Sequence, residues 1–303
     1  MADLTFHDVL AREGIVPTDV TVILHSPVQK LLQSLLPALV RTRRGAIEAY
    51  QATHSPGAEA ALRQGRPWVA SFVKVGQDVP SSHSRMLFAG LYRNAGARDR
   101  SYAEIMAEPE VVFLHETFGT HQEMISRDPE RTWTWFDLHL DPQMEALQGR
   151  LVLSVRLTPN YVRRGENLEA RVRAIHEVST FDADPPDWRD WVLGAAVLRA
   201  IPPGWAARLR EWRGIYLICD RTDGARYVGS AYGETNLLGR WLAHVDGDAG
   251  VTVQLASRNP ANFVFSILER VSPDMEARDV IALEHGWMTR LHTRGTRAHG
   301  LNA

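Results

Sequence analysis

A strand–turn–strand pattern near the C-terminus constrains the fold of this chain more than any other feature. Residues 214–219 form a run of β-branched and aromatic side chains, and a second such run follows at 226–230. Between them lies Asp223-Gly224, a dipeptide typical of the tight turn in a β-hairpin. Because side chains alternate between the two faces of a strand, pairing of these runs can present Tyr216 and Tyr227 on one face.

The hairpin is followed by patterns for two helices and a third strand. A helix beginning near residue 235 places Arg240 and His244 four residues apart, so that they share a face. An aromatic and β-branched run at 263–268 predicts a strand, and residues 273–291 have the spacing of a long helix. Together these elements predict a three-stranded antiparallel sheet flanked by helices.

The ordered residues of this region resemble the GIY-YIG nuclease family. Gly214-Ile215-Tyr216 and Tyr227-Val228-Gly229 resemble its two signature motifs, and the residues after the second motif are similar to those of restriction-endonuclease-like members. Further positions that match in order are Arg240, His244, Glu284 and Asn302. The resemblance covers residues 205–303, the last third of the chain, and implies hydrolysis of phosphodiester bonds.

The resemblance also implies a role for each residue of this set. Phosphodiester hydrolysis needs an activated water and stabilisation of charge on the phosphate. Tyr216 would activate the water, Tyr227 would orient it, and Arg240 would bind the scissile phosphate. Free tyrosine has a pKa of about 10, so we expect Arg240 and a metal ion to lower the pKa of Tyr216.

Glu284 is the metal ligand that the resemblance implies. A single carboxylate completed by water and phosphate oxygens suits Mg²⁺, with Mn²⁺ as the alternative. His244 would pair with Tyr216 or assist proton transfer, unless it only packs within its helix face. Asn302 would position a phosphate or support the sheet.

The first part of the chain predicts a separate α+β domain at residues 1–183. Residues 1–65 are mostly helical in pattern, whereas 66–180 contain short β-branched and aromatic runs, among them 111–114. These runs predict a small, partly closed β-barrel with helices around it. This architecture resembles PUA-like barrels, a class that includes readers of modified bases.

A helical linker is expected between the two domains at residues 184–204. Acidic residues and the pair Pro185-Pro186 mark its beginning. Apolar residues at helical spacing then predict a helix over 188–200. The C-terminal domain follows at residues 205–303.

Aromatic and basic side chains in the β-rich region are candidates for DNA contact. Two tryptophans fall on one face of an expected strand, where they would stack on a flipped base or belong to the core. Four arginines form either a phosphate-contacting patch or an ordinary solvated surface. The residues are Trp133, Trp135, Arg163, Arg164, Arg171 and Arg173.

Charge and cysteine content exclude several classes of protein. The chain has 34 basic and 36 acidic residues, which excludes a uniformly basic nucleic-acid coat protein. Residues 205–303 carry a net charge of only +1, from 12 Arg and 11 acidic residues, so we expect DNA affinity to need another region. The single cysteine, Cys219, excludes an intramolecular disulfide framework and a cysteine-based zinc cluster.

The sequence therefore predicts a metal-dependent DNA endonuclease of restriction type. The N-terminal domain would select double-stranded DNA, with base-modified DNA as one option, and a double-strand break would need a homodimer or two encounters. Neither a signal peptide nor a membrane span is recognisable, so a cytoplasmic protein is expected. The alternatives that stay open are a repair or homing-like nuclease, an RNA-cleaving toxin, and a nucleic-acid-binding regulatory protein with a vestigial nuclease domain.

Overall fold

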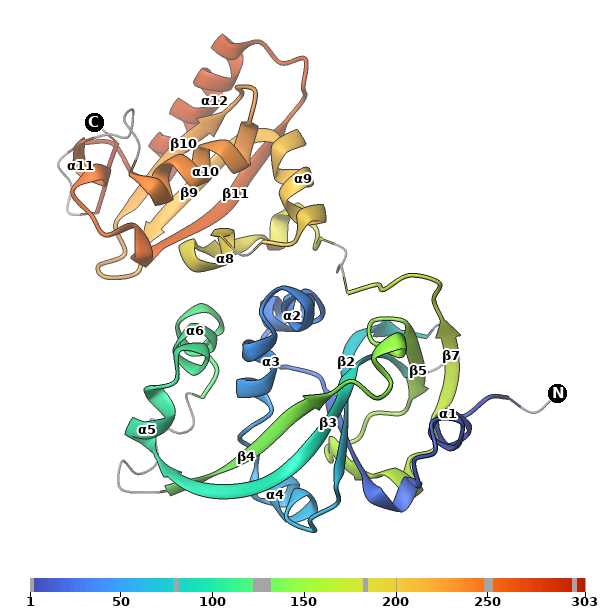
Figure 1. Ribbon diagram of the computed structural model, residues 1–303. Helices are drawn as coiled ribbons and strands as arrows, with labels where there is room; N and C mark the ends of the chain where they lie inside the picture. Colours follow the sequence, from blue (N-terminus) through green and yellow to red (C-terminus); the bar gives the residue numbers. More distant parts are fainter. Residues whose placement is uncertain are drawn as a thin grey trace. The chain divides into compact units, whose positions relative to one another are not determined.

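The computed structural model describes residues 3–78, 82–121, 132–181, 185–199, 201–247, 253–295 and 299–302. The chain divides into two compact units, Met1–Ala183 and Asp184–Ala303 (Figure 1). Each unit contains helices and a β-sheet, so the expected α+β class is confirmed. Within the described residues, no helix has the length and apolar character needed to cross a membrane.

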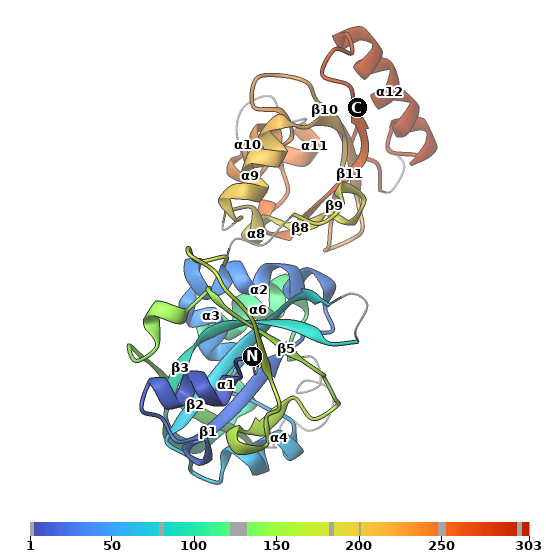
Figure 2. The ribbon, with the colours of Figure 1, turned by 90° about the vertical axis from the view of Figure 1, so that its right-hand side faces the viewer.

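The first unit is built on a curled sheet of seven strands (Figure 2). Its strands run in the order β6-β1-β2-β3-β5-β7, and β4 pairs with the second half of the long strand β3. Strands β1 and β2 are parallel, and the other pairs are antiparallel. The bounds are β1 (Val20–His25), β2 (Trp68–Gln77), β3 (Ser84–Ser101), β4 (Thr132–Asp141), β5 (Leu151–Val155), β6 (Val162–Arg164) and β7 (Arg171–Ile175). A PUA-like barrel stays a prediction.

Helices pack on this sheet, and strand β1 is buried on both of its faces. Every residue of β1 is buried, because Val22 and Leu24 join one hydrophobic cluster with Phe72 while Ile23 joins another with Phe136. The helices are α1 (Phe6–Arg12), α2 (Lys30–Thr42), α3 (Arg44–Tyr50), α4 (Pro56–Leu62), α5 (Tyr102–Met106) and α6 (Pro109–Phe118). In Figure 1, α2, α3 and α6 lie together on one side of the sheet.

One expected strand of the first unit is a helix. The run at 111–114 lies inside α6, so its prediction as a strand was wrong. Pro109 occupies the first turn of this helix, and Gly119 ends it with a left-handed backbone (φ 70°). A short apolar run fits a strand and a buried helix equally well, and here the two end signals decide for the helix.

Two buried histidines make the stability of the first unit depend on pH. Burial lowers the pKa of His25 to about 3 and that of His54 to about 4, whereas an unfolded histidine titrates near ~6.5. The folded state therefore binds fewer protons, and its free energy of unfolding falls as the pH drops below ~6.5. Between pH 7 and pH 5 we expect urea unfolding to measure a loss of about 2 kcal/mol per histidine. The loss of stability between pH 7 and pH 5 should be smaller in His54→Gln. Equal free energies of unfolding of the wild type at the two pH values would contradict the lowered pKa values of the histidines.

The second unit contains a four-stranded antiparallel sheet in the order β10-β9-β11-β8. Helices α10 and α12 cover its opposite faces (Figure 2). The strands are β8 (Val192–Gly194), β9 (Arg213–Asp220), β10 (Arg226–Ala231) and β11 (Phe263–Val271). The helices are α8 (Ala195–Arg199), α9 (Pro203–Glu211), α10 (Asn236–Asp246), α11 (Val253–Ala256) and α12 (Ala277–Arg290).

The fourth strand of this sheet corrects two expectations. The sheet was expected to have three strands, and residues 188–200 were expected to form one helix. Instead a short 3-10 helix at Trp188–Asp190 leads into β8, which pairs with β11 before α8 begins. Trp191 anchors the segment, because its buried ring packs against Trp205 and Trp212. Pairing with β8 gives the backbone N–H and C=O groups at the edge of β11 hydrogen-bond partners. The helical spacing of the apolar residues in this segment does not indicate that pairing.

Candidate active site

The register of β9 and β10 places both signature tyrosines on the same face of the sheet. Tyr216 is paired with Gly229, and Tyr227 is paired with Ile218, which lies two positions after Tyr216 in β9 and so points to the same face. Residues paired in this way share a face, and the two tyrosine rings have centroids 6.4 Å apart. The face that the alternation predicted for the two tyrosines is therefore confirmed.

Two glycines of the signature motifs allow close approaches that a side chain would block. A Cβ atom at Gly229 would overlap the hydroxyl and ring of Tyr216. A Cβ atom at Gly214 would overlap the backbone carbonyl of Glu269, where β11 departs from regular pairing with β9. Both glycines therefore have a packing reason, and Gly229 makes the space in which Tyr216 lies.

Helix α10 brings His244 and Arg240 to the hydroxyl of Tyr216. The helix buries Leu238 and Trp241 against the sheet, which turns His244 inward. The Nε2 atom of His244 lies 2.8 Å from the Tyr216 hydroxyl oxygen, and the charge of Arg240 acts on the same tyrosine. A neutral imidazole that carries its proton on Nδ1 accepts at Nε2 from the tyrosine O–H.

Burial and charge set the protonation of this pair. Burial, assisted by the charge of Arg240, lowers the pKa of His244 to about 4, so the imidazole is neutral near pH 7. Burial raises the pKa of Tyr216 well above its usual value, and Arg240 opposes this only in part. The expectation that Arg240 lowers the pKa of Tyr216 below its ordinary value is not met by the protein's own groups, because desolvation outweighs the attraction of the cation. Tyr216 is a neutral phenol beside a neutral imidazole.

Glu284 approaches the tyrosines from α12. It is half-buried, and the hydroxyl of Ser230 donates a hydrogen bond to its Oε2 atom. Burial raises the pKa of Tyr227, and the negative charge of Glu284 raises it further. The pKa of Arg240 is raised mainly by its interaction with Tyr216 and also by the charge of Glu284. Glu284 thus lies within electrostatic reach of Tyr216, Tyr227 and Arg240.

Ser230 is the site residue that the sequence analysis did not assign. The only sequence signal was its position directly after Tyr227-Val228-Gly229, which is equally typical of an ordinary strand end. Ser230 lies opposite Ile215 and so faces α12, whereas the tyrosines face α10. Its contact with Glu284 fixes a carboxylate oxygen and depends on how α12 packs, which the strand pattern does not contain.

The donor set around Glu284 fits a hydrated magnesium or manganese ion better than a fully protein-bound metal. Among the residues that the structure describes, no group of three or more His, Cys, Asp or Glu side chains is arranged to hold an ion. One half-buried carboxylate leaves most coordination positions to water and phosphate oxygens, which is the usual situation of Mg²⁺ in proteins. Glu284 would hold such an ion.

Asn302 supports the sheet. Its Oδ1 atom accepts from the Val228 backbone N–H at 2.9 Å, and its Nδ2 atom donates to the Val228 carbonyl at 2.7 Å. The side chain is almost fully buried. Of the two roles expected for Asn302, this geometry supports the sheet-supporting one, because it fixes the strand between Tyr227 and Gly229.

We expect Asn302→Ala to destabilise the second unit by about 1–3 kcal/mol, because two buried backbone groups of Val228 lose their partners. Denaturant unfolding monitored by tryptophan fluorescence would measure the loss. The matched control is Asn262→Ala, whose side chain donates to the exposed hydroxyl of Thr222 and which should change stability by less than ~0.5 kcal/mol. Equal effects of the two substitutions would show that Asn302 has no special role in the sheet.

The candidate DNA contacts of the first unit do not form one free basic patch. Arg171 pairs with Asp3 at 2.9 Å, and Arg173 pairs with Asp78 at 3.3 Å. Arg163 donates to the backbone carbonyl of Arg156 at 2.6 Å, and Arg164 is exposed at the end of β6. The two ion pairs offset the charge of Arg171 and Arg173, and Arg163 uses a donor on a backbone carbonyl, so the patch stays a prediction.

The two tryptophans of β4 have different surroundings. Trp133 is buried and lines a cavity of the first unit. Trp135 is partly exposed, with the Arg100 guanidinium carbon 4.8 Å from its ring centroid. Trp135 is not among the described residues that line the cavity. Of the two tryptophans, Trp133 is therefore the candidate for contact with a base, together with cavity residues from other segments.

No family model matches the sequence, and no curated protein matches it either. Among solved structures, the chain is similar to the catalytic domain of the homing endonuclease I-TevI, with 26% identity over 30% of this chain and 96% of that chain, at a TM-score of 0.24. A mutant of the same intron endonuclease domain matches with 24% identity over 30% of this chain and 92% of that chain, at a TM-score of 0.25. TM-scores this low establish neither the fold nor the function of this chain.

Proposed function

We propose that the second unit is a metal-dependent endonuclease that hydrolyses phosphodiester bonds in DNA. One observation carries the proposal. A buried tyrosine–imidazole pair, Tyr216 and His244, lies beside Arg240 and within the electrostatic reach of Glu284. The resemblance of the sequence to GIY-YIG nucleases points to the same four residues.

The neutral tyrosine–histidine pair can move a proton without first creating a buried phenolate. As the oxygen of a water bonds to the phosphorus and the bond from phosphorus to the leaving oxygen breaks, the Tyr216 oxygen takes a proton of the water while its own proton passes to Nε2 of His244. The leaving oxygen departs as an alkoxide and takes up a proton from solvent. Arg240 disfavours the resulting imidazolium in the free protein, but a bound phosphate offsets the charge of Arg240 and raises the proton affinity of His244. Proton transfer is thereby coupled to the presence of substrate.

Arg240 and Tyr227 complete the chemistry that the chain itself supplies. Arg240 is exposed and stays charged, so its guanidinium can donate two hydrogen bonds to a phosphate. The hydroxyl of Tyr227 would orient the attacking water. A bound Mg²⁺ or Mn²⁺ on Glu284 would neutralise negative charge developing on the phosphate and the leaving oxygen. Ser230 holds the carboxylate of Glu284 in place.

Selection of the DNA is assigned to the first unit in this proposal. The weak net charge of residues 205–303 supports this assignment, because phosphate neutralisation supplies most non-specific affinity for DNA. We propose a restriction-type enzyme for which base modification decides whether the DNA is cut. One active site cuts one strand, so a double-strand break needs a homodimer or two encounters.

The test uses matched DNA substrates. Purified protein with Mg²⁺ or Mn²⁺ is incubated with unmodified plasmid and with the same DNA carrying 5-methylcytosine or 5-hydroxymethylcytosine, with RNA as a competitor. Cuts confined to a modified set are the expected result. Discrete cuts in unmodified DNA would contradict modification dependence but support the endonuclease. Cleavage of RNA alone would contradict the substrate, and tight DNA binding without cleavage would favour a regulatory protein.

A further inference from the structure

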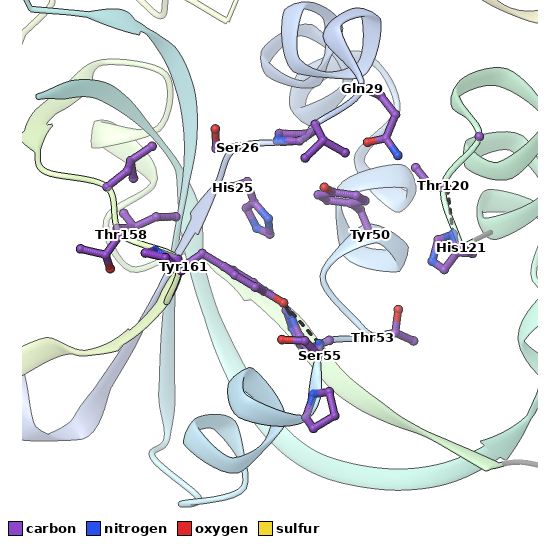
Figure 3. A pocket seen from close by; sticks show the side chains of 18 of the residues that line it. His25, Ser26, Gln29, Tyr50, Thr53, Ser55, Thr120, His121, Thr158 and Tyr161 are labelled. Carbon is purple, nitrogen blue, oxygen red and sulfur yellow. Dashed lines mark hydrogen bonds between the residues drawn. The ribbon is translucent and has the colours of Figure 1, made fainter. Parts of the chain in front are cut away.

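The first unit contains a cavity of about 800 Å³, which lies within the usual size range of small-molecule sites (Figure 3). Side chains from five separate segments converge on it. They come from the end of β1, the end of α3, the stretch beyond α6, the start of β4 and the stretch before β6, represented by His25, Tyr50, His121, Trp133 and Tyr161. The catalytic residues proposed above do not line it.

Aromatic rings form much of the cavity wall. Tyr50, Trp133 and Tyr161 line it together with the imidazoles of His25 and His54. His25 and Tyr50 have ring centroids 5.4 Å apart, and His54 and Tyr161 have centroids 5.9 Å apart. Such a wall offers flat surfaces on which a planar ring can stack.

The wall is uncharged. Among the described residues that line the cavity, none is Asp, Glu, Lys or Arg. Burial lowers the pKa of His25 to about 3, and the pKa values of His54 and His121 to about 4, so the imidazoles are neutral near pH 7. A charged ligand would lose its hydration here without gaining a counter-ion, which disfavours phosphates, carboxylates and ammonium groups.

The wall also carries hydrogen-bonding groups. The Nδ1 atom of His54 lies 3.1 Å from the hydroxyl of Tyr161, while its Nε2 atom is buried without a partner among the residues described. The side chain of His54 is more than nine-tenths buried. This nitrogen has almost no accessible surface, so a ligand in the cavity meets the hydroxyl groups of the wall instead. Thr53, Ser55 and Thr158 add hydroxyl groups at the wall.

We propose that this cavity binds an uncharged, planar heterocycle that carries hydrogen-bonding groups, namely a nucleobase turned out of a DNA duplex. The choice of DNA as the source of the base rests on the proposed endonuclease function. Stacking would involve Tyr50, Trp133 and Tyr161, and the edge of the base would bond to hydroxyl groups of the wall such as that of Thr53. The phosphates and sugar would stay outside the uncharged cavity.

Binding of free nucleosides tests the cavity independently of cleavage. The full chain, without divalent metal, is titrated to millimolar concentration with the 2′-deoxynucleosides of standard bases, 5-methylcytosine and 5-hydroxymethylcytosine. Deoxyribose 5-phosphate, which lacks a base, is titrated in parallel. Calorimetry and saturation-transfer NMR measure binding. At least one nucleoside should bind, and the sugar phosphate should not.

Cavity variants locate the site. Thr53→Trp places a bulky ring in the cavity, where it competes with the base for the stacking surfaces, and should weaken nucleoside binding at least about tenfold. Tyr50→Ala removes one of the stacking rings of the wall and should also weaken binding. The matched control is Thr18→Trp, at an exposed threonine outside the cavity, which should bind as the wild type does. Melting curves check that each variant folds.

The outcomes separate this inference from the proposed endonuclease. Absence of nucleoside binding, equal binding of the sugar phosphate, or full binding by both folded cavity variants would overturn the base site even if the protein cuts DNA. Nucleoside binding that is lost in the cavity variants would uphold the base site even if the protein cuts no DNA, in which case only the endonuclease proposal fails.

Discussion

Glu284→Gln should reduce the metal-dependent cleavage rate by at least about 10²–10³-fold while leaving DNA binding nearly unchanged. Glutamine has the size of glutamate and can still accept the hydrogen bond from Ser230, so the packing of α12 is preserved. What it lacks is the negative charge that would hold Mg²⁺ or Mn²⁺. Single-turnover cleavage gives the rate, and fluorescence anisotropy with labelled DNA in EDTA gives the affinity.

The matched control for this prediction is Glu234→Gln, which removes an exposed carboxylate from the same unit. It should cleave at the wild-type rate. A Glu284→Gln protein that cleaves as fast as Glu234→Gln would show that Glu284 is not the metal ligand. A protein that loses cleavage and also melts at a much lower temperature would show that Glu284 serves the fold instead.

Tyr216→Phe should lower kcat by at least about 10²-fold with little change in KM. Phenylalanine keeps the ring that packs against Trp241 with centroids 6.3 Å apart and fills the space next to Gly229. It removes the hydroxyl that links the attacking water to His244. Steady-state cleavage kinetics measure the effect.

Tyr232→Phe is the control for the loss of a hydroxyl, because Tyr232 is exposed and lies just beyond β10. It should leave kcat unchanged. If Tyr216→Phe keeps wild-type kcat, the proton path through Tyr216 and His244 is wrong. If it raises KM alone, the hydroxyl helps to bind DNA and does not move a proton.

The hairpin of the second unit could be predicted from sequence because its signals are local. Asp223-Gly224 fixes the turn, and the period of two along β9 and β10 then decides which face Tyr216 and Tyr227 share. The spacing of Arg240 and His244 likewise places both on one side of α10 near the tyrosine hydroxyl. Each of these conclusions depends on residues close together in the chain.

The remaining features depend on packing between distant segments. Strand β8 forms because β11 has an open edge, and the contact of Ser230 with Glu284 forms because α12 packs against β10. The direction of the Tyr216 pKa depends on how completely the ring is buried, which a list of neighbouring charges does not reveal. The cavity joins His25, Tyr50 and Tyr161 from separate elements, and no spacing in the sequence indicates it.

The most direct test of the account is cleavage of supercoiled plasmid, modified and unmodified, by the purified full chain with Mg²⁺ and with EDTA. The account predicts nicked or linear product with Mg²⁺ in at least one DNA set, none with EDTA, and none above background from Glu284→Gln. Intact DNA under every condition, or equal cleavage with EDTA, would contradict a metal-dependent endonuclease centred on Tyr216, His244, Arg240 and Glu284.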